Sequence, residues 1–248
     1  MQPLSDHTVI LIPTYNNAGT LSDVVRRALA LRLPVIVVND GSTDDTAAVL
    51  ESLRDEALQV LAFPVNRGKG KALKAGFREA QRQGYQYAVT LDADGQHFPE
   101  EVPALLEAAG ERTLVIGSRN LTADGMPAGN TFANRFSNFW FTVQTLRRIP
   151  DTQTGFRVYP LRTTGGIGLM TRRYEAELLL LVFSAWKGVH LAPVPIRVAY
   201  PEDRVSHFRP FWDFFRISVL NTVLCILALV YGYPRMALTA LFCRRSKR

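Results

Sequence analysis

The chain has 248 residues, of which 47% are hydrophobic and 21% are charged, and its formal net charge is +7. Between Phe214 and Arg248 there is no acid and there are six bases, so the remainder carries only about +1. This nearly neutral main body excludes the basic face of a nucleic-acid-binding protein, and two cysteines, Cys225 and Cys243, exclude a disulfide framework or a zinc cluster.

The first half of the chain alternates between strand and helix patterns. Apolar, β-branched runs predict strands at 8–12, 35–39, 58–63, 87–92 and 113–118. The segments between them have helical spacing, as at 20–29, where Thr20 and Asp23 are predicted to form a capping box. This alternation predicts an α/β fold with a mostly parallel sheet flanked by helices on both faces. The N-terminus has no basic region before its first apolar run, so we expect no signal peptide and a reducing, cytosolic setting.

The second half begins with an aromatic helix pattern at 132–148. Its stripe of Phe136, Phe139 and Trp140 predicts a core-facing side, and the alternative is a wall for an apolar acceptor. A strand at 156–160, a helix at 174–188 and a strand at 189–200 follow. Glu175 and Glu177 are interpreted as ordinary residues of that helix.

The C-terminal tail is apolar and ends in basic residues. After an aromatic, weakly amphipathic stretch at 208–218, Ile217 to Tyr233 contains no charged residue, which is near the lower limit of about 17 residues for a bilayer span. Pro234 is predicted to break this helix. Three structures fit the pattern: a helix lying in the membrane interface, a short or re-entrant insertion, or a buried helix of a soluble core.

Asp92 and Asp94 flank one alanine directly behind the strand at 87–92. Two carboxylates this close repel each other, so they need a shared proton or a cation between them. A proton-sharing pair would not account for the neighbouring motifs. Carboxylate oxygens with Gln96 nearby suit Mg²⁺ or Mn²⁺, which usually binds together with diphosphate oxygens and water.

Polar loops follow the other early strands at the same predicted sheet edge. The sequence IPTYNN at 12–17 and the sequence NDGSTDD at 39–45, with Asp40, are expected to form a pocket for a base and a ribose. The loop NRGKGKALKAG at 66–76 lacks the Walker pattern, and either Lys69 or Lys71 is expected to contact an anion near the helix start.

These stretches resemble the family 2 glycosyltransferases of the GT-A fold, and among them the dolichyl- or polyprenyl-phosphate mannose and glucose synthases. The resemblance runs over about 8–210 and includes LDADGQHFPEEVPAL, GSR at 117–119, DTQTGFRVYP and RVSHFRP. It implies a nucleotide diphosphate sugar bound by Pro13, Tyr15, Asp40, Lys71 and Asp92, and a metal held by Asp92, Asp94 and Gln96. It further implies that Arg119 and Arg157 lie near the acceptor, and that Arg204, Ser206 and His207 belong to a loop closing over the diphosphate. Asn17 and Asn39 stand where the family usually has acids, which leaves the nucleoside base open.

The predicted activity is inverting transfer from a UDP- or GDP-sugar to a membrane lipid or lipid-linked acceptor. An acceptor phosphate needs cations only, whereas a hydroxyl acceptor needs a base, for which Asp151 is the candidate. The predicted division is a catalytic domain at 1–207 and a membrane-associating tail at 208–248, placed on the cytoplasmic face. The alternatives are a nucleotidyltransferase and a non-catalytic membrane-docking protein, and the sequence does not fix whether the chain forms a homo-oligomer.

Overall fold

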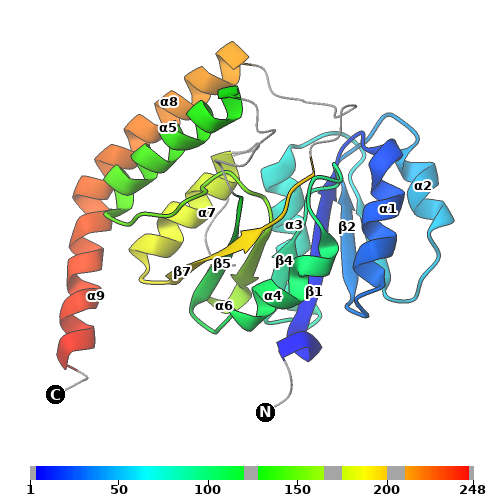
Figure 1. Ribbon diagram of the computed structural model, residues 1–248, viewed down its shortest axis with the longest axis horizontal. Helices are drawn as coiled ribbons and strands as arrows, with labels where there is room; N and C mark the ends of the chain where they lie inside the picture. The colour runs from blue at the N-terminus through cyan, green and yellow to red at the C-terminus, as the bar shows by residue number, and fades with distance from the viewer. Residues whose placement is uncertain (1–3, 120–127, 165–174, 200–209, 246–248) are drawn as a thin grey trace.

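A seven-stranded sheet with helices on both faces forms the body of the protein (Figure 1). The computed structural model describes residues 4–119, 128–164, 175–199 and 210–245. The strands are β1 (Thr8–Thr14), β2 (Val35–Asn39), β3 (Leu58–Ala62), β4 (Tyr87–Thr90), β5 (Thr113–Arg119), β6 (Arg157–Pro160) and β7 (His190–Ile196). The helices are α1 (Ala18–Leu29), α2 (Thr46–Ser52), α3 (Lys69–Arg82), α4 (Val102–Glu107), α5 (Ala128–Thr145), α6 (Leu161–Thr164), α7 (Glu175–Trp186), α8 (Pro210–Leu227) and α9 (Tyr233–Arg245), with short 3-10 helices at Leu4–His7 and Pro99–Glu101 and a π-helical turn, η3, at Ala228–Gly232.

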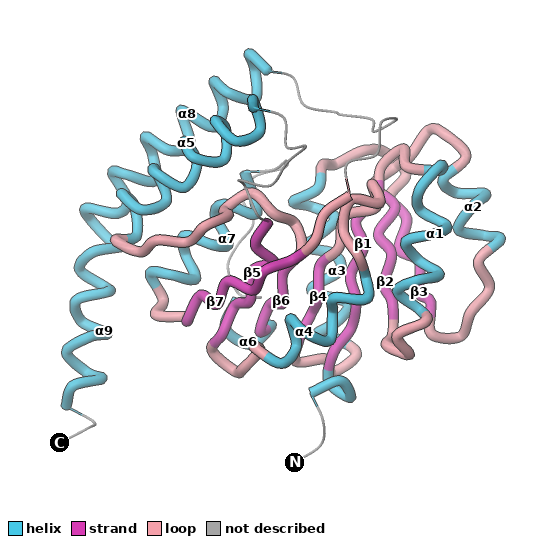
Figure 2. The backbone as a smooth tube through the Cα atoms, viewed as in Figure 1, coloured by secondary structure: helices cyan, strands magenta, loops and turns pink. Residues whose placement is uncertain are grey.

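The strand order is β3-β2-β1-β4-β6-β5-β7, which Figure 2 follows across the molecule. Only β6 runs antiparallel to its neighbours β4 and β5, whereas the other described pairings are parallel, so the predicted mostly parallel sheet is confirmed. In the register, Thr14 of β1 lies beside Asn39 of β2 and Leu11 lies beside Thr90 of β4. The carboxyl ends of these three strands therefore meet at one edge, where open α/β sheets bind ligands.

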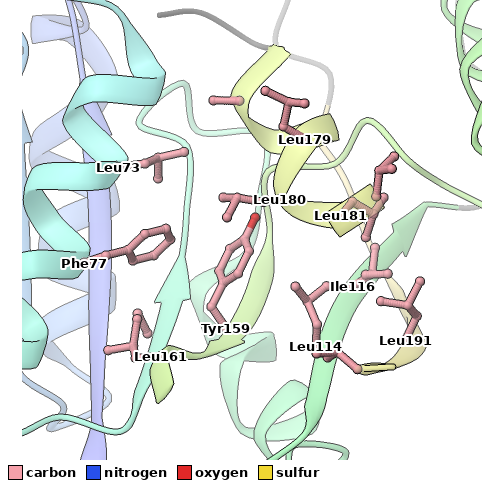
Figure 3. Close-up of a cluster of buried hydrophobic side chains, with 14 of the residues drawn as sticks. Leu73, Phe77, Leu114, Ile116, Tyr159, Leu161, Leu179, Leu180, Leu181 and Leu191 are labelled. Atoms are coloured by element: carbon pink, nitrogen blue, oxygen red, sulfur yellow. The ribbon is translucent and has the colours of Figure 1, made fainter. Parts of the chain in front are cut away.

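Side chains of the central strands alternate between two apolar layers, as pleated strands require. Ile10 and Ile12 of β1 pack in the layer beneath α1, α2 and α4, whereas Val9 and Leu11 face the layer that contains α3 and α7. Figure 3 shows the second layer, where Leu73 and Phe77 of α3 point toward Tyr159 of β6 while the leucines of α7 close it from above. The loops at the carboxyl edge thus rest on a sheet buried on both sides.

The start of α1 differs from the prediction. The helix begins at Ala18, and the predicted capping box of Thr20 and Asp23 is wrong because Thr20 lies inside the helix. The hydroxyl of Thr20 instead donates to the Ala93 carbonyl at 2.6 Å, and Asp44 of the next loop accepts from the Ala18 N–H at 3.1 Å. The start of α1 is therefore hydrogen-bonded to the loop after β2 and to the loop after β4, both at the ligand-binding edge.

The tail forms one nearly continuous helix from α8 through η3 to α9, which passes beside α5 (Figure 1). Pro234 does not break it, contrary to the prediction. The π-helical turn comes directly before the proline and alters the local hydrogen bonding where the proline lacks an N–H, so the chain bends and continues. Leu224 and Ala228 join the layer beneath α7, yet the stretch Ile217–Thr239 is apolar enough to cross a membrane and only 22% of its most apolar window is buried. The tail is thus packed on one side and open on the other.

Candidate active site

The two loops expected to hold a nucleoside lie against each other at the carboxyl edge. The Asn16 N–H donates to the Ser42 hydroxyl at 3.0 Å, and the Asn16 side-chain oxygen accepts from the Thr43 N–H at 2.8 Å. Pro13 is buried in β1 opposite Val38, and Tyr15 follows at the loop start, half-buried. The structure therefore brings the predicted pocket residues together, while their contact with a nucleoside stays a prediction.

Asp40 fixes the loop in front of α3. Its two carboxylate oxygens accept the backbone N–H groups of Arg67 and Gly68, each at 2.7 Å. Burial raises the pKa of Asp40, and these two hydrogen bonds oppose that effect. Gly41 beside it has a φ of 69° and lies so close to the backbone of Val65 that a side chain would not fit. Asp40 thus positions the first residue of α3, which is Lys69.

Lys69 reaches the first of the two aspartates, Asp92. Its ammonium lies 2.6 Å from Asp92 Oδ1 and 2.9 Å from Oε2 of Glu177 in α7. Burial lowers the pKa of Lys69, but the two carboxylates outweigh burial and raise it above its ordinary value. Lys71 lies two positions further along the same helix, and the predicted contact of Lys71 with the donor stays a prediction. Glu177 is thus more than the ordinary helix residue that the sequence predicts, and its place in the apolar run EAELLLL is a weak signal for a buried charge.

Gly155 lies directly against the carboxyl group of Asp92. A side chain at Gly155 would overlap all three atoms of the Asp92 carboxyl group. Burial raises the pKa of Asp92, but the ammonium of Lys69 outweighs burial and lowers it below the usual range. Asp92 is therefore a fixed anion between a glycine and a lysine, and the motif DTQTG supplies the glycine.

Asp94 is the member of the Asp92–Asp94 pair whose ionised form is disfavoured. Burial, and then the charge of Asp92, raise the pKa of Asp94 to about 6. Its Oδ1 accepts the Gln96 N–H at 3.0 Å across Gly95, which has a φ of 73°. A cation beside Asp94 would relieve this repulsion, so the residues present fit a divalent ion. No group of three or more His, Cys, Asp or Glu among the described residues is placed to hold a metal, so a divalent ion there needs other ligands such as diphosphate and water.

A second charged pair lies at the end of β5. Arg119 binds Asp151 through two parallel bonds, Nε to Oδ2 at 2.6 Å and Nη2 to Oδ1 at 3.0 Å. Asn134 of α5 and the Gln153 N–H also donate to Asp151 Oδ1, at 2.6 and 3.0 Å. Burial raises the pKa of Asp151, but these donors outweigh burial and lower it. Asp151 is thus fully enclosed and poorly suited to take a proton, and it orients Arg119.

Arg157 does not pair with Asp151 and is fully buried in β6. Its guanidinium donates to the Thr152 and Glu177 carbonyl oxygens at 2.8 and 2.9 Å and to the Tyr159 hydroxyl at 3.2 Å. These bonds join the motif DTQTG to α7, so Arg157 has a structural task, and its predicted contact with an acceptor stays a prediction.

His97 is a buried residue on which the charges of both groups act, and the sequence analysis does not name it as a site residue. It is 6% exposed, its ring packs on Phe156, and its Nδ1 has no hydrogen-bond partner among the described residues. Burial lowers the pKa of His97 to about 4, and the charges of Asp92, Lys69, Arg119 and Asp151 all act on it. The imidazole is therefore neutral near pH 7. Its place directly after DADGQ was the only available signal.

Three predicted residues, Arg204, Ser206 and His207, lie outside the described residues. Their proposed closure over a diphosphate stays a prediction. The described residues therefore provide three parts of the site: a paired-loop pocket, the Asp92–Asp94 pair with Lys69, and the Arg119–Asp151 pair.

Comparison with known proteins points to one family. The protein-family model described as glycosyl transferase family 2 matches residues 9–168. An undecaprenyl-phosphate mannosyltransferase of Micrococcus luteus is 32% identical over 75% of this chain and 81% of its own length. A polyprenol monophosphomannose synthase of Mycolicibacterium smegmatis is 34% identical over 82% of this chain and 81% of its own length.

Solved structures share the fold at lower identity. Glucosyl-3-phosphoglycerate synthase of Mycobacterium tuberculosis, crystallised with Mn²⁺ and UDP, gives a TM-score of 0.62 at 19% identity over 92% of this chain and 81% of that one. Mannosyl-3-phosphoglycerate synthase of Rubrobacter xylanophilus gives 0.59 at 19% identity over 94% of this chain and 74% of that one. These neighbours confirm the predicted GT-A fold.

Proposed function

The chain belongs to glycosyl transferase family 2, and we propose that it transfers a sugar from a nucleotide diphosphate sugar to a polyprenyl phosphate. The relatives named above are a transferase to undecaprenyl phosphate and a synthase of polyprenol monophosphomannose, which supports a lipid phosphate as the acceptor. The observation that carries the proposal is that one sheet edge joins the paired loops, the Asp92–Asp94 pair and the Arg119–Asp151 pair.

The donor side requires stabilisation of a departing nucleoside diphosphate. Asp92, Asp94 and Gln96 would hold Mg²⁺ or Mn²⁺, which supplies positive charge to the leaving group when bound. The loops at 12–17 and 39–45 would bind the nucleoside, and Lys71 would contact the phosphates. A single in-line attack on the anomeric carbon would invert its configuration. Arg204 and His207 are proposed to close over the diphosphate.

The acceptor side favours a phosphate over a hydroxyl. A hydroxyl must lose a proton to a base during the attack, but the carboxylate of Asp151 already accepts bonds from Arg119, Asn134 and Gln153. A phosphate arrives as an anion and needs only an oriented cation, which Arg119 offers because Asp151 fixes its guanidinium. The chemistry thus agrees with the acceptor class of the relatives.

The membrane is the proposed location of the acceptor. Val219, Val223, Ile226 and Val230 follow one another at helical spacing along α8 and η3 and are 46–69% exposed. Phe139 and Leu146, at α5 and just beyond its end, are also exposed. If the helix lies in the bilayer interface, lipid covers this apolar surface. We assign the helix to the cytoplasmic face of the membrane, where nucleotide sugars and basic flanks are expected.

Product analysis tests the proposed reaction. The full chain is incubated in detergent with Mn²⁺, undecaprenyl phosphate and UDP- or GDP-sugars, and the lipid product is identified by mass. Transfer with release of a nucleoside diphosphate supports the proposal, and Asp94→Ala should abolish it. Release of pyrophosphate would support a nucleotidyltransferase, and calorimetry without any binding of UDP or GDP would support a non-catalytic protein.

Liposome flotation tests the membrane surface. The variant Val219→Ser/Val223→Ser/Ile226→Ser should lose most binding to anionic vesicles. The matched control is Val60→Ser/Val65→Ser, which removes exposed valines on and after β3 and should bind as the wild type does. Unchanged flotation of the triple variant, together with a concentration-dependent dimer, would instead assign the stripe to a second copy of the chain.

A further inference from the structure

The lysine that bridges Asp92 and Glu177 lies where a divalent ion would need to approach. Lys69 Nζ is 2.6 Å from Asp92 Oδ1, which is a direct charge-assisted contact. The side chains of Lys69 and Asp92 are only 19% and 25% exposed, so water screens their attraction weakly. The ammonium therefore already neutralises the anion that the proposed metal site requires.

Asp92 has little freedom to turn away from this lysine. A Cβ atom at Gly155 would lie only 2.4–2.9 Å from the atoms of the Asp92 carboxyl group, and the Lys69 backbone is fixed because Asp40 accepts hydrogen bonds from the N–H groups of the two preceding residues. The contact between Asp92 and Lys69 is thus opened more easily by moving the flexible lysine side chain than by moving Asp92.

Glu177 gives the lysine a place to remain after that move. Its Oε2 is 2.9 Å from Lys69 Nζ, and its Oε1 is buried without a hydrogen-bond partner among the described residues. A buried acceptor without a partner is costly, so this oxygen offers a favourable second contact for the ammonium. Glu177 therefore offers Lys69 an anion that is not part of the proposed metal site.

We propose that Lys69 is an internal competitor of the divalent ion: it holds Asp92 in the ligand-free protein, and when metal and donor bind it leaves Asp92, keeps its contact with Glu177 and contacts the donor diphosphate. This inference rests on the proposed function. The charge of the ammonium makes metal binding weak without nucleotide, and the released ammonium strengthens binding of the diphosphate. Because coupling between two ligands is reciprocal, each of them then improves the affinity for the other. Glu177 is a positioning residue in this scheme.

Mn²⁺ affinity in the absence of any substrate tests the competition directly. The electron paramagnetic resonance signal of free Mn²⁺ is titrated with the full chain, with and without UDP or GDP. We expect Lys69→Met to bind Mn²⁺ at least about tenfold more tightly than the wild type without nucleotide, within the usual range of coupling between sites. Glu177→Gln should bind it several-fold more weakly, because Lys69 loses its second anion. Lys74→Met, on the same helix, is the matched control and should bind as the wild type does.

The outcomes separate this inference from the proposed function. Absence of Mn²⁺ binding by the wild type with UDP and with GDP would refute the proposed donor site and the inference with it. Coupled binding of Mn²⁺ and nucleotide in the wild type, with unchanged or weaker Mn²⁺ affinity in folded Lys69→Met, would refute the inference alone.

If circular dichroism shows that Lys69→Met does not fold, Lys69→Met/Glu177→Gln removes the pair together and leaves the net charge of the cluster unchanged. The measured quantity is then the ratio of Mn²⁺ dissociation constants without and with nucleotide. A ratio at least about tenfold smaller than in the wild type supports the inference, and an unchanged ratio overturns it.

Discussion

Replacing Asp94 by asparagine should stabilise the ligand-free protein while removing its ability to bind a divalent ion. The pKa of Asp94 is raised from 3.8 to about 6, first by burial and then by the charge of Asp92. A difference of about two pKa units corresponds to about 3 kcal/mol of unfavourable free energy for the ionised form at pH 7. Because Asp94 is only partly buried, solvent reduces this penalty, and we expect about 1.5 kcal/mol.

The effect has a defined pH dependence. Below pH 4 the carboxyl group is protonated in both the folded and the unfolded wild type, so Asp94→Asn gains nothing. Between pH 4 and about 6 the unfolded wild type ionises and the folded one does not, so the wild type loses stability relative to the variant. Above pH 6 the advantage of the variant is complete, and for a chain of this length it should raise the melting temperature by roughly 3–6 °C.

Thermal unfolding followed by circular dichroism at pH 4.5 and pH 7.5 measures both effects. The variant keeps an oxygen that can accept the Gln96 N–H, so that hydrogen bond is matched. Asp44→Asn on the neighbouring loop is a control of opposite sign, because hydrogen bonds from Thr46 and Ala18 outweigh burial and lower the pKa of Asp44. Mn²⁺ with UDP or GDP should stabilise the wild type and not Asp94→Asn. A variant no more stable than the wild type at pH 7.5 would refute the claim that the two aspartates repel each other.

Three further substitutions address the rest of the site. Asp151→Asn should lower the free energy of unfolding in urea by about 3–5 kcal/mol, because it leaves Arg119 without its anion; a loss below about 1 kcal/mol would contradict the buried pair. Arg119→Lys keeps the charge but loses the two parallel bonds, so steady-state kinetics should show the KM for the lipid phosphate rising at least about tenfold while the KM for the donor stays within about twofold. An equal rise in both would place Arg119 elsewhere. Gly155→Ala should reduce kcat at least about tenfold, because its methyl group would overlap Asp92. The control Gly19→Ala, which has open space around it, should instead increase the free energy of unfolding by up to about 1 kcal/mol. Normal turnover of Gly155→Ala would show that Asp92 can shift.

Much of the sheet could be predicted because each central strand is a short β-branched run bounded by polar loops. β2 was predicted with its observed bounds, and β1 and β5 were predicted to within two residues. The direction of β6 could not be predicted, because its side chains are buried whether the strand runs parallel or antiparallel. Pro234 does not end the tail helix because a π-helical turn precedes it and Pro234 is only the second residue of α9, which cannot be predicted from the residue type alone.

The site was predictable where one motif supplies the chemistry and unpredictable where distant segments meet. Asp92 and Asp94 follow one strand, and their repulsion follows from their spacing alone. The contact of Lys69 with Glu177 joins residues that are more than a hundred positions apart, and spacing says nothing about it. The choice between Lys69 and Lys71 depends on the rotation of α3, which is set by the hydrogen bonds that the Arg67 and Gly68 N–H groups donate to Asp40.

The surroundings of the site favour the ionised form of Asp151 on the acceptor side and disfavour the ionised form of Asp94 on the donor side. On the acceptor side, Asp151 has its hydrogen bonds satisfied by Arg119, Asn134 and Gln153, so its geometry is fixed before any ligand binds. On the donor side, Asp94 ionises at a cost, and a buried oxygen of Glu177 has no hydrogen-bond partner within the described part of the chain. A ligand that brings the missing charges would relieve these unfavourable terms, so we expect donor and metal to change the site on binding and the proposed lipid phosphate to meet a site already in place. The same contrast explains why one substitution at Asp94 stabilises the protein and one at Asp151 destabilises it, although both remove a carboxylate.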